Sequence, residues 1–245
     1  MTKKWMEDMT EKPREIDFEY QWQDKLSGAI ADSAGEKARV TVLHGGHGIS
    51  DTSTSRERLI WTCQMLDNLE DLTDLESRQE ILTQCHCSYP LEDLLEVKLA
   101  YRVNGDIDQA LKMLEDKFEV FLREVLELDE ELIKTILDQG WGLAGRRQGS
   151  TIIATKIPKS GYLRDYFQEE DPVEKRRLYC HCPRVRDEVG SDPRLPMEYC
   201  YCGAGFYQGI WQEILGVPVK VEMLESVMQG DDVCKIAIHL PIQDL

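Results

Sequence analysis

The 245-residue chain is strongly acidic, with 46 Asp and Glu against 29 Lys and Arg and a formal net charge of −17. A surface of this sign repels phosphate backbones and anionic lipids, so the composition argues against non-specific binding of nucleic acid or of membranes. No apolar run reaches the roughly 18 residues of a membrane helix, and the N-terminus lacks the apolar stretch of a signal peptide, so we expect a cytoplasmic protein.

Residues 1–50 are polar and include a glycine-rich patch over residues 44–48, and we interpret them as a loosely ordered lead-in. His44 and His47 lie in this patch and could ligate a metal ion together. No carboxylate or thiol stands next to them in the sequence, so a flexible polar loop is the favoured interpretation.

Helical periodicity fills residues 51–140, where apolar residues recur at steps of three and four. It begins near Ser55, and the first helix places Cys63 on its core face. Asp74 can cap a second helix, and Gly105 suits the C-terminal end of a third. Two more amphipathic helices follow and end at Gly140. We expect a helical bundle.

Residues 141–245 change in character, with short alternating stretches and many turn residues. Residues 151–158 form a predicted strand, and Pro172 opens a short helix. The segment FYQGIWQEIL predicts a longer helix ending at Gly216. Two alternating strands follow, the second through Cys234. The predicted fold class is therefore α+β, a helical bundle packed with a C-terminal α/β domain that has an antiparallel sheet.

The eight cysteines should be reduced in the cytoplasm, which points to metal binding or thiol chemistry before disulfides. Six of them form three Cys-x-Cys pairs, at Cys85/Cys87, Cys180/Cys182 and Cys200/Cys202. On an α-helix, residues two apart point about 200° away from each other, so such a pair could not share one ion. Because prolines near two of the pairs favour extended backbone, we expect those pairs to point to one side.

The two C-terminal pairs form a C-x-C-x17-C-x-C motif that can supply four thiolates. Zinc accepts four thiolates tetrahedrally, so the motif predicts a zinc site at Cys180, Cys182, Cys200 and Cys202. An iron–sulfur cluster, a redox pair and plain buried thiols are the alternatives. We expect Cys85 and Cys87 to remain outside the site.

The stretch EYCYCGAGFYQGIWQEILGVPVKVEMLESVMQGDDVCKIAIHLP resembles the end of 4-vinyl-reductase-like domains and of the related L-2-amino-thiazoline-4-carboxylate hydrolase-like family. The resemblance covers residues 141–245 and implies a zinc ion held by the cysteine before the helix, by an acidic residue and by two cysteines flanking a Gly-Asp turn. That pattern adds Cys234 as a ligand beside Cys200, although Ser226 stands where the first cysteine of the turn is expected. Five cysteines would then compete for four positions.

The resemblance further implies a small organic ligand bound between the helix layer and the sheet. The predicted function is a zinc-binding module with a structural metal. A hydrolase of a small cyclic amide or thiazoline carboxylate and a thiol redox or iron–sulfur protein are the alternatives. We see no Ser-His-Asp order, P-loop or dinucleotide fingerprint and assign no catalytic residue. A homodimer is compatible with the sequence.

Overall fold

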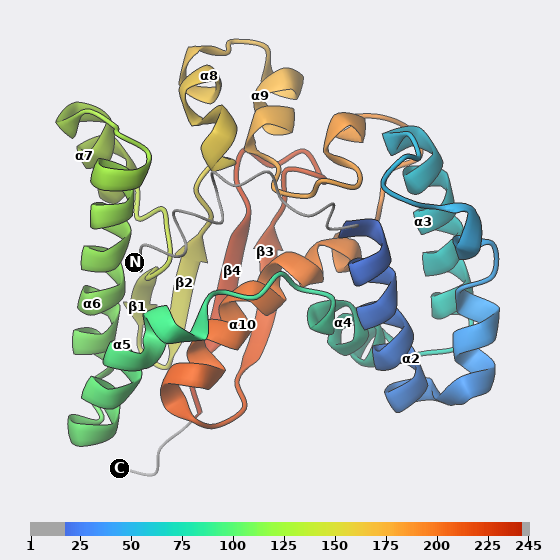
Figure 1. Ribbon diagram of the computed structural model, residues 1–245, viewed down its shortest axis with the longest axis horizontal. Helices are drawn as coiled ribbons and strands as arrows, with labels where there is room; N and C mark the ends of the chain where they lie inside the picture. The colour runs from blue at the N-terminus through green and yellow to red at the C-terminus, as the bar shows by residue number, and fades with distance from the viewer. Residues whose placement is uncertain (1–17, 242–245) are drawn as a thin grey trace.

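The structure is a computed structural model that describes residues 18–241; residues 1–17 of the expected lead-in lie outside the described residues. Helices occupy most of the N-terminal part, and the C-terminal part adds a four-stranded antiparallel sheet (Figure 1). The predicted α+β class is confirmed. Within the described residues, none of the helices combines the length and the apolar composition required to cross a bilayer.

A long helix, α2 (Phe18–Val42), occupies most of the region that we expected to be loosely ordered, so that interpretation is wrong for these residues. The helix is kinked at Gly35, whose φ of 86° is open to glycine at little cost. One face carries the buried side chains Trp22, Leu26, Ile30 and Val42. Burial of this face stabilises a helix whose other residues are mostly polar.

The predicted helical region forms α3 (Ser55–Glu70), α4 (Leu75–Gln84), α5 (Leu91–Asn104), α6 (Ile107–Val120), a π-helical turn over Phe121–Val125 and α7 (Glu130–Asp138). The expected helix ends are confirmed at two positions. The Asp74 carboxylate accepts a hydrogen bond from the Ser77 backbone N–H at the start of α4. Gly105 ends α5 with a φ of 67°.

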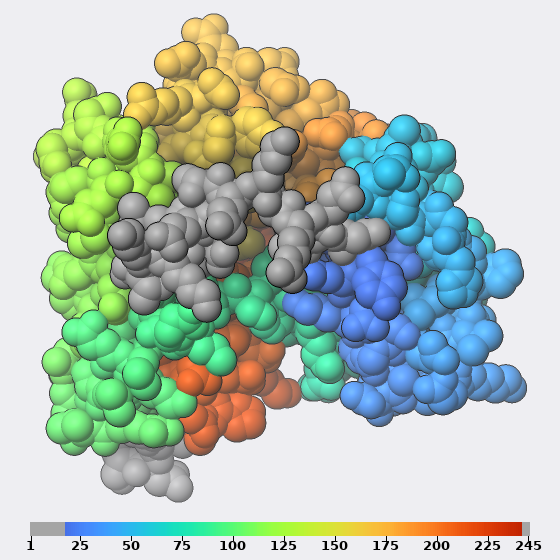
Figure 2. Space-filling view, viewed as in Figure 1, coloured from blue at the N-terminus to red at the C-terminus, as the bar shows by residue number. Residues whose placement is uncertain are grey.

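The helices form two groups on opposite sides of the molecule. In Figure 1, α2, α3 and α4 lie on one side and α6 and α7 on the other, with the sheet between them. The space-filling view shows the same separation, with the blue residues of α2 and α3 across the face from the green residues of α6 and α7 (Figure 2).

The sheet has the strand order β1-β2-β4-β3, and every neighbouring pair is antiparallel. Its strands are β1 (Arg146–Gln148), β2 (Thr151–Thr155), β3 (Lys220–Glu225) and β4 (Lys235–His239). Strands β2, β3 and β4 correspond to predicted strands. Strand β1 was not predicted, because its three exposed polar side chains show no alternation of apolar and polar residues.

Helix α10 (Tyr201–Leu215) packs on strands β3 and β4 with one side and on helices α4 and α5 with the other. It is preceded by α8 (Leu163–Gln168), α9 (Pro172–Tyr179) and a 3-10 turn over Met197–Cys200. Asp171 caps α9, and Gly216 ends α10, as expected. However, α10 starts five residues before the predicted helix and therefore includes Cys202.

A buried ion pair joins α2 to the loop after α9. The Arg184 guanidinium donates to both Glu19 carboxylate oxygens, at 2.7 and 2.8 Å, and the two side chains are 3% and 0% exposed. The guanidinium carbon lies 3.7 Å from the centre of the Trp22 ring. On the other side, the Arg58 side chain of α3 donates to the Arg184 carbonyl oxygen at 3.0 Å. The N-terminal helices therefore contact the cysteine-bearing loop directly.

Candidate metal centre

Cys180 and Cys182 follow the end of α9, where the backbone becomes extended at Cys180. The buried Tyr179 fixes this position, because its hydroxyl donates to the Lys156 carbonyl oxygen at the end of β2 and accepts from the Cys234 N–H at 3.0 Å. One tyrosine thereby holds the start of the Cys180 loop beside the start of β4. The His181 ring binds the Ile157 carbonyl oxygen at 2.7 Å and is buried, which lowers its pKa to about 3.

Cys200 and Cys202 lie on helical backbone, whereas two thiols this close in sequence need extended or turn backbone to share one ion. Cys200 ends the 3-10 turn, and Cys202 is in the first turn of α10. Residues two apart on a helix point about 200° from each other. The two thiols therefore point to different surroundings.

Cys200 belongs to a group on the sheet side of α10, together with Cys180, Cys234 and Ser226. The Cys200 sulfur lies 3.0 Å from the hydroxyl oxygen of Ser226, and Ser226 also lowers the pKa of Cys234 against the larger effect of burial. Burial raises the pKa of all three thiols, and the charge of Cys234 raises those of Cys180 and Cys200 further. Ser226 thus occupies the position between Cys200 and Cys234 where the resemblance places a cysteine.

Cys202 belongs to a second group, with Cys182 and Tyr199. The Cys182 sulfur lies 3.1 Å from the Tyr199 hydroxyl, and this hydroxyl accepts from the Arg184 guanidinium at 3.0 Å. Burial raises the pKa of Cys202 to about 12, and the charge of Cys182 is the next cause. Cys180 connects the two groups, because the charge of Cys182 raises its pKa as well.

Lys156 supplies positive charge beside both groups. Its ammonium lies 5.8 Å from the centre of the Phe206 ring, and a Cβ placed on Gly203 of α10 would come within 3.3 Å of it. Its charge lowers the pKa of Cys180, Cys202 and Cys234 against the larger effect of burial. Since four thiolates on one divalent zinc carry a net charge of −2, the Lys156 ammonium would offset part of that charge, whereas the charge of the buried Arg184 is already balanced by Glu19.

Two of the thiols contact hydroxyl groups, Cys182 that of Tyr199 and Cys200 that of Ser226. Across residues 18–241, no three His, Cys, Asp or Glu side chains form a group that could hold a metal ion. To bind one, Cys182 and Cys200 would exchange their contacts with Tyr199 and Ser226 for bonds to the ion.

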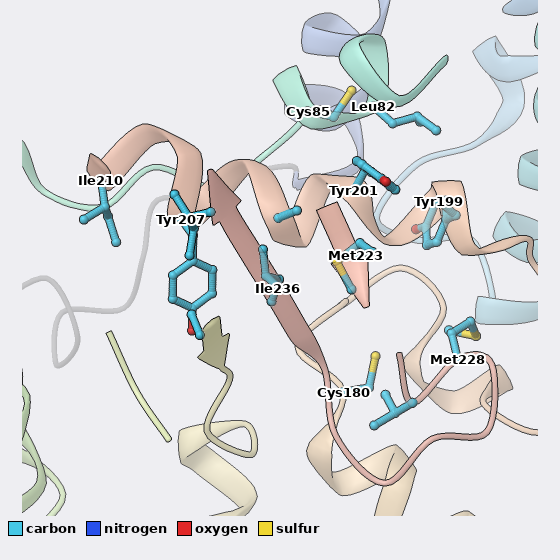
Figure 3. Close-up of a cluster of buried hydrophobic side chains, with 14 of the residues drawn as sticks. Leu82, Cys85, Cys180, Tyr199, Tyr201, Tyr207, Ile210, Met223, Met228 and Ile236 are labelled. Atoms are coloured by element: carbon cyan, nitrogen blue, oxygen red, sulfur yellow. The ribbon is translucent and has the colours of Figure 1, made fainter. Parts of the chain in front are cut away.

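The other candidate residues lie elsewhere. Cys63 is half-buried on α3 and packs against the core, and the sequence predicted this role. His47 lies within the 3-10 turn η1 (Gly46–Gly48), and His44 precedes that turn by two residues. Cys85 is buried at the end of α4, and Figure 3 shows it on the other side of α10 from Cys180.

Three residues of the site were missed from the sequence: Lys156, Arg184 and Tyr199. Lys156 lies within the strand predicted over residues 151–158, and Arg184 stands two residues after Cys182. Both positions could have been recognised as cations near thiols. No sequence signal places Tyr199 beside Cys182, because that contact depends on how the loop after α9 returns to α10.

Residues 159–244 match a family model described as "Family of unknown function (DUF6144)", so the chain is similar to that family over less than half of its length. No curated protein and no solved structure matches the chain. The matched stretch contains the five cysteines from Cys180 to Cys234 and excludes Cys63, Cys85 and Cys87. The resemblance to vinyl-reductase-like domains and the hydrolase-like family stays a prediction.

Proposed function

We propose that this protein binds one zinc ion through thiolates of the cluster formed by Cys180, Cys182, Cys200, Cys202 and Cys234. The main support is that these thiols, from three separate parts of the chain, gather around the N-terminal end of α10. A cluster of thiols in one neighbourhood is the donor set that zinc prefers. Lys156 would offset part of the negative charge of the loaded site.

The metal is structural in this proposal. A site closed by four thiolates has no open position for water or substrate, and it would hold α10, the loop after α9 and the start of β4 together. Reduced thiols are required, so the proposal places the protein in the cytoplasm. The binding of a small organic ligand beside the site remains part of the proposal by resemblance. Two cavities among residues 18–241 have volumes of about 60 and 70 Å³ and do not identify that ligand.

Thiolate catalysis has less support than metal binding. A cysteine nucleophile is activated when its pKa is lowered by a nearby cation or helix N-terminus. Here burial outweighs Lys156 and raises the pKa of Cys180, Cys200, Cys202 and Cys234. Thiols with raised pKa values are poor nucleophiles at neutral pH, whereas a metal ion can displace their protons on binding.

Metal analysis of the full chain purified without oxygen tests this proposal. We expect one zinc per chain and no visible absorption, since an iron–sulfur cluster would colour the protein. The binding free energy of a structural zinc ion is typically about 10–16 kcal/mol, and each of four ligands supplies roughly a quarter of it. Replacing one ligand by serine should therefore weaken zinc binding by at least about 100-fold. We expect this loss in at least three of the five single cysteine variants. Cys63→Ser is the matched control and should bind zinc normally.

Absence of stoichiometric metal, together with unchanged zinc affinity in all five variants, would overturn the proposal. Stoichiometric iron with sulfide would replace it by the iron–sulfur alternative. A redox pair would be indicated if two of these thiols formed a reversible disulfide in metal-free protein with unchanged stability.

A further inference from the structure

The outward side of α5 carries a stripe of exposed aliphatic side chains. They follow one another at steps of four residues, each is between 51% and 87% exposed, and they are Leu91, Leu95, Leu99 and Val103. The opposite side of the helix is buried around Val97, where α5 packs on α6 and α10. Single exposed apolar residues are common on protein surfaces, but four on one helix face indicate a contact surface.

The same face has the residue spacing at which two helices pack together. Its central line runs at steps of three, four and three residues through Glu92, Leu95, Leu99 and Arg102. Residues at these steps lie along one side of a helix and form the seam of paired helices. In α5, two leucines occupy the middle of this seam, an acidic residue stands at its start and a basic residue at its end.

The two charged residues of the seam are not used by the rest of the described chain. Glu92 and Arg102 are both exposed, and neither side chain forms an ion pair or a hydrogen bond with another of residues 18–241. By contrast, the adjacent Glu96 pairs with Lys117 of α6 at 3.0 Å. The seam therefore offers one free charge of each sign beside exposed leucines.

This pattern is symmetric about Val97. Leu95 and Leu99 lie two residues before and after it, and Glu92 and Arg102 lie five residues before and after it. If a second α5 packs antiparallel with both Val97 positions at the same height, Leu95 meets Leu99 of the second copy. Glu92 then meets Arg102 of the second copy at each end. A parallel pairing would instead place like charges opposite each other, which is unfavourable.

We propose that two copies of this chain associate through α5, packed antiparallel about a two-fold axis. A two-fold interface requires a surface that is complementary to itself, and the seam of α5 has that property in both its apolar and its charged residues. Burial of the leucines provides the driving force, and the charge pairs fix the direction of the second helix. Because each copy contributes little more than one helix, we expect a dissociation constant in the micromolar range.

Sedimentation velocity of the full chain over a concentration series tests the association. We expect the apparent mass to rise from that of one chain to that of two as the concentration increases. Leu95→Glu places a charge in the middle of the seam and should abolish the dimer. Leu72→Glu is the matched control, because Leu72 is also exposed but lies outside α5, and it should behave as the wild type. Circular dichroism should show unchanged melting temperatures, since both replaced side chains are exposed.

Charge reversal tests the antiparallel register. Glu92→Arg and Arg102→Glu should each weaken self-association by at least about tenfold, since each change places like charges together at both ends of the dimer. An equimolar mixture of these two variants should dimerise again, because each Glu then meets an Arg at both ends. Glu131→Arg, which changes the net charge as much as Glu92→Arg but lies on α7, should leave the association unchanged.

Three results would overturn the proposal. The first is a wild type that stays monomeric up to roughly 100 µM. The second is a dimer that survives Leu95→Glu, and the third is a mixture of the charge-reversed variants that associates no better than either variant alone. If the wild type is monomeric and only a chain lacking residues 1–17 dimerises, the occupant of the stripe is that segment and not a second copy.

Discussion

Replacing Glu19 by glutamine should destabilise the protein strongly. The change keeps the shape of the side chain but removes the charge that faces Arg184 in a site where both groups are almost completely buried. The guanidinium would keep its hydrogen bond to Tyr199 and its contact with the Trp22 ring, but neither carries a full negative charge. A buried cation would then lack a counterion.

The expected cost follows from the geometry. Two short hydrogen bonds, at 2.7 and 2.8 Å, join the ion pair, and each charge-assisted bond contributes about 1.5–3 kcal/mol. Breaking a buried pair by removing one partner typically costs about 3–5 kcal/mol. For a chain of this size, that corresponds to a fall of roughly 6–20 °C in melting temperature.

Urea denaturation followed by circular dichroism measures this cost, provided that the wild type and the variant show the same slope of unfolding free energy against urea concentration. Arg184→Met should cost a similar amount, and the double variant Glu19→Gln/Arg184→Met should cost clearly less than the sum of the two single changes. The control is Glu76→Gln, since Glu76 pairs with Lys220 on an exposed surface and should contribute about 0–1 kcal/mol. A loss below 1 kcal/mol in Glu19→Gln, or strict additivity in the double variant, would refute the reasoning.

Two other predictions concern α10. Tyr207→Phe removes a buried hydroxyl that donates to the Gly142 carbonyl oxygen at 2.9 Å, and should cost about 1–2 kcal/mol at neutral pH. Burial raises the pKa of Tyr207, so above about pH 10 the unfolded chain releases a proton that the folded protein keeps. The free energy of unfolding of the wild type therefore falls as the pH rises above this value. In urea titrations, the difference in unfolding free energy between the wild type and Tyr207→Phe should narrow by about 1.4 kcal/mol per pH unit. A difference that stays constant with pH would contradict this prediction. Gly205→Ala should cost at least about 2 kcal/mol by forcing α4 away from α10, whereas Gly28→Ala in α2, where nothing lies within 4 Å of the added atom, should be neutral or stabilising. Equal melting temperatures for these two variants would show that the contact at Gly205 is loose.

The fold was predictable where local patterns agree with packing. Asp74, Asp171, Gly105 and Gly216 were correctly identified as helix ends because capping depends on a few neighbouring residues. The start of α10 was not, because Gly203 and Gly205 disfavour helix in isolation. The close contact between α10 and the Thr83 carbonyl oxygen requires a residue without a side chain at Gly205. This packing outweighs the low helix propensity of glycine.

The remaining errors have similar causes. The lead-in was misread because the apolar residues of α2 are diluted by polar ones and interrupted at Gly35. Strand β1 has three exposed polar side chains, and only its pairing with β2 makes it a strand. In the site, the thiols could be named from their spacing, but the division of Cys200 and Cys202 between two groups depends on the early start of α10.

The position of β2 has a practical consequence for anyone preparing shorter versions of the protein. The stretch that matches the family model starts at residue 159, after β2 has already been completed. A fragment cut there would leave the hydrogen-bonding edge of β4 open to pairing with other molecules. It would also retain Arg184 without Glu19, so we expect such a fragment to aggregate rather than to fold alone.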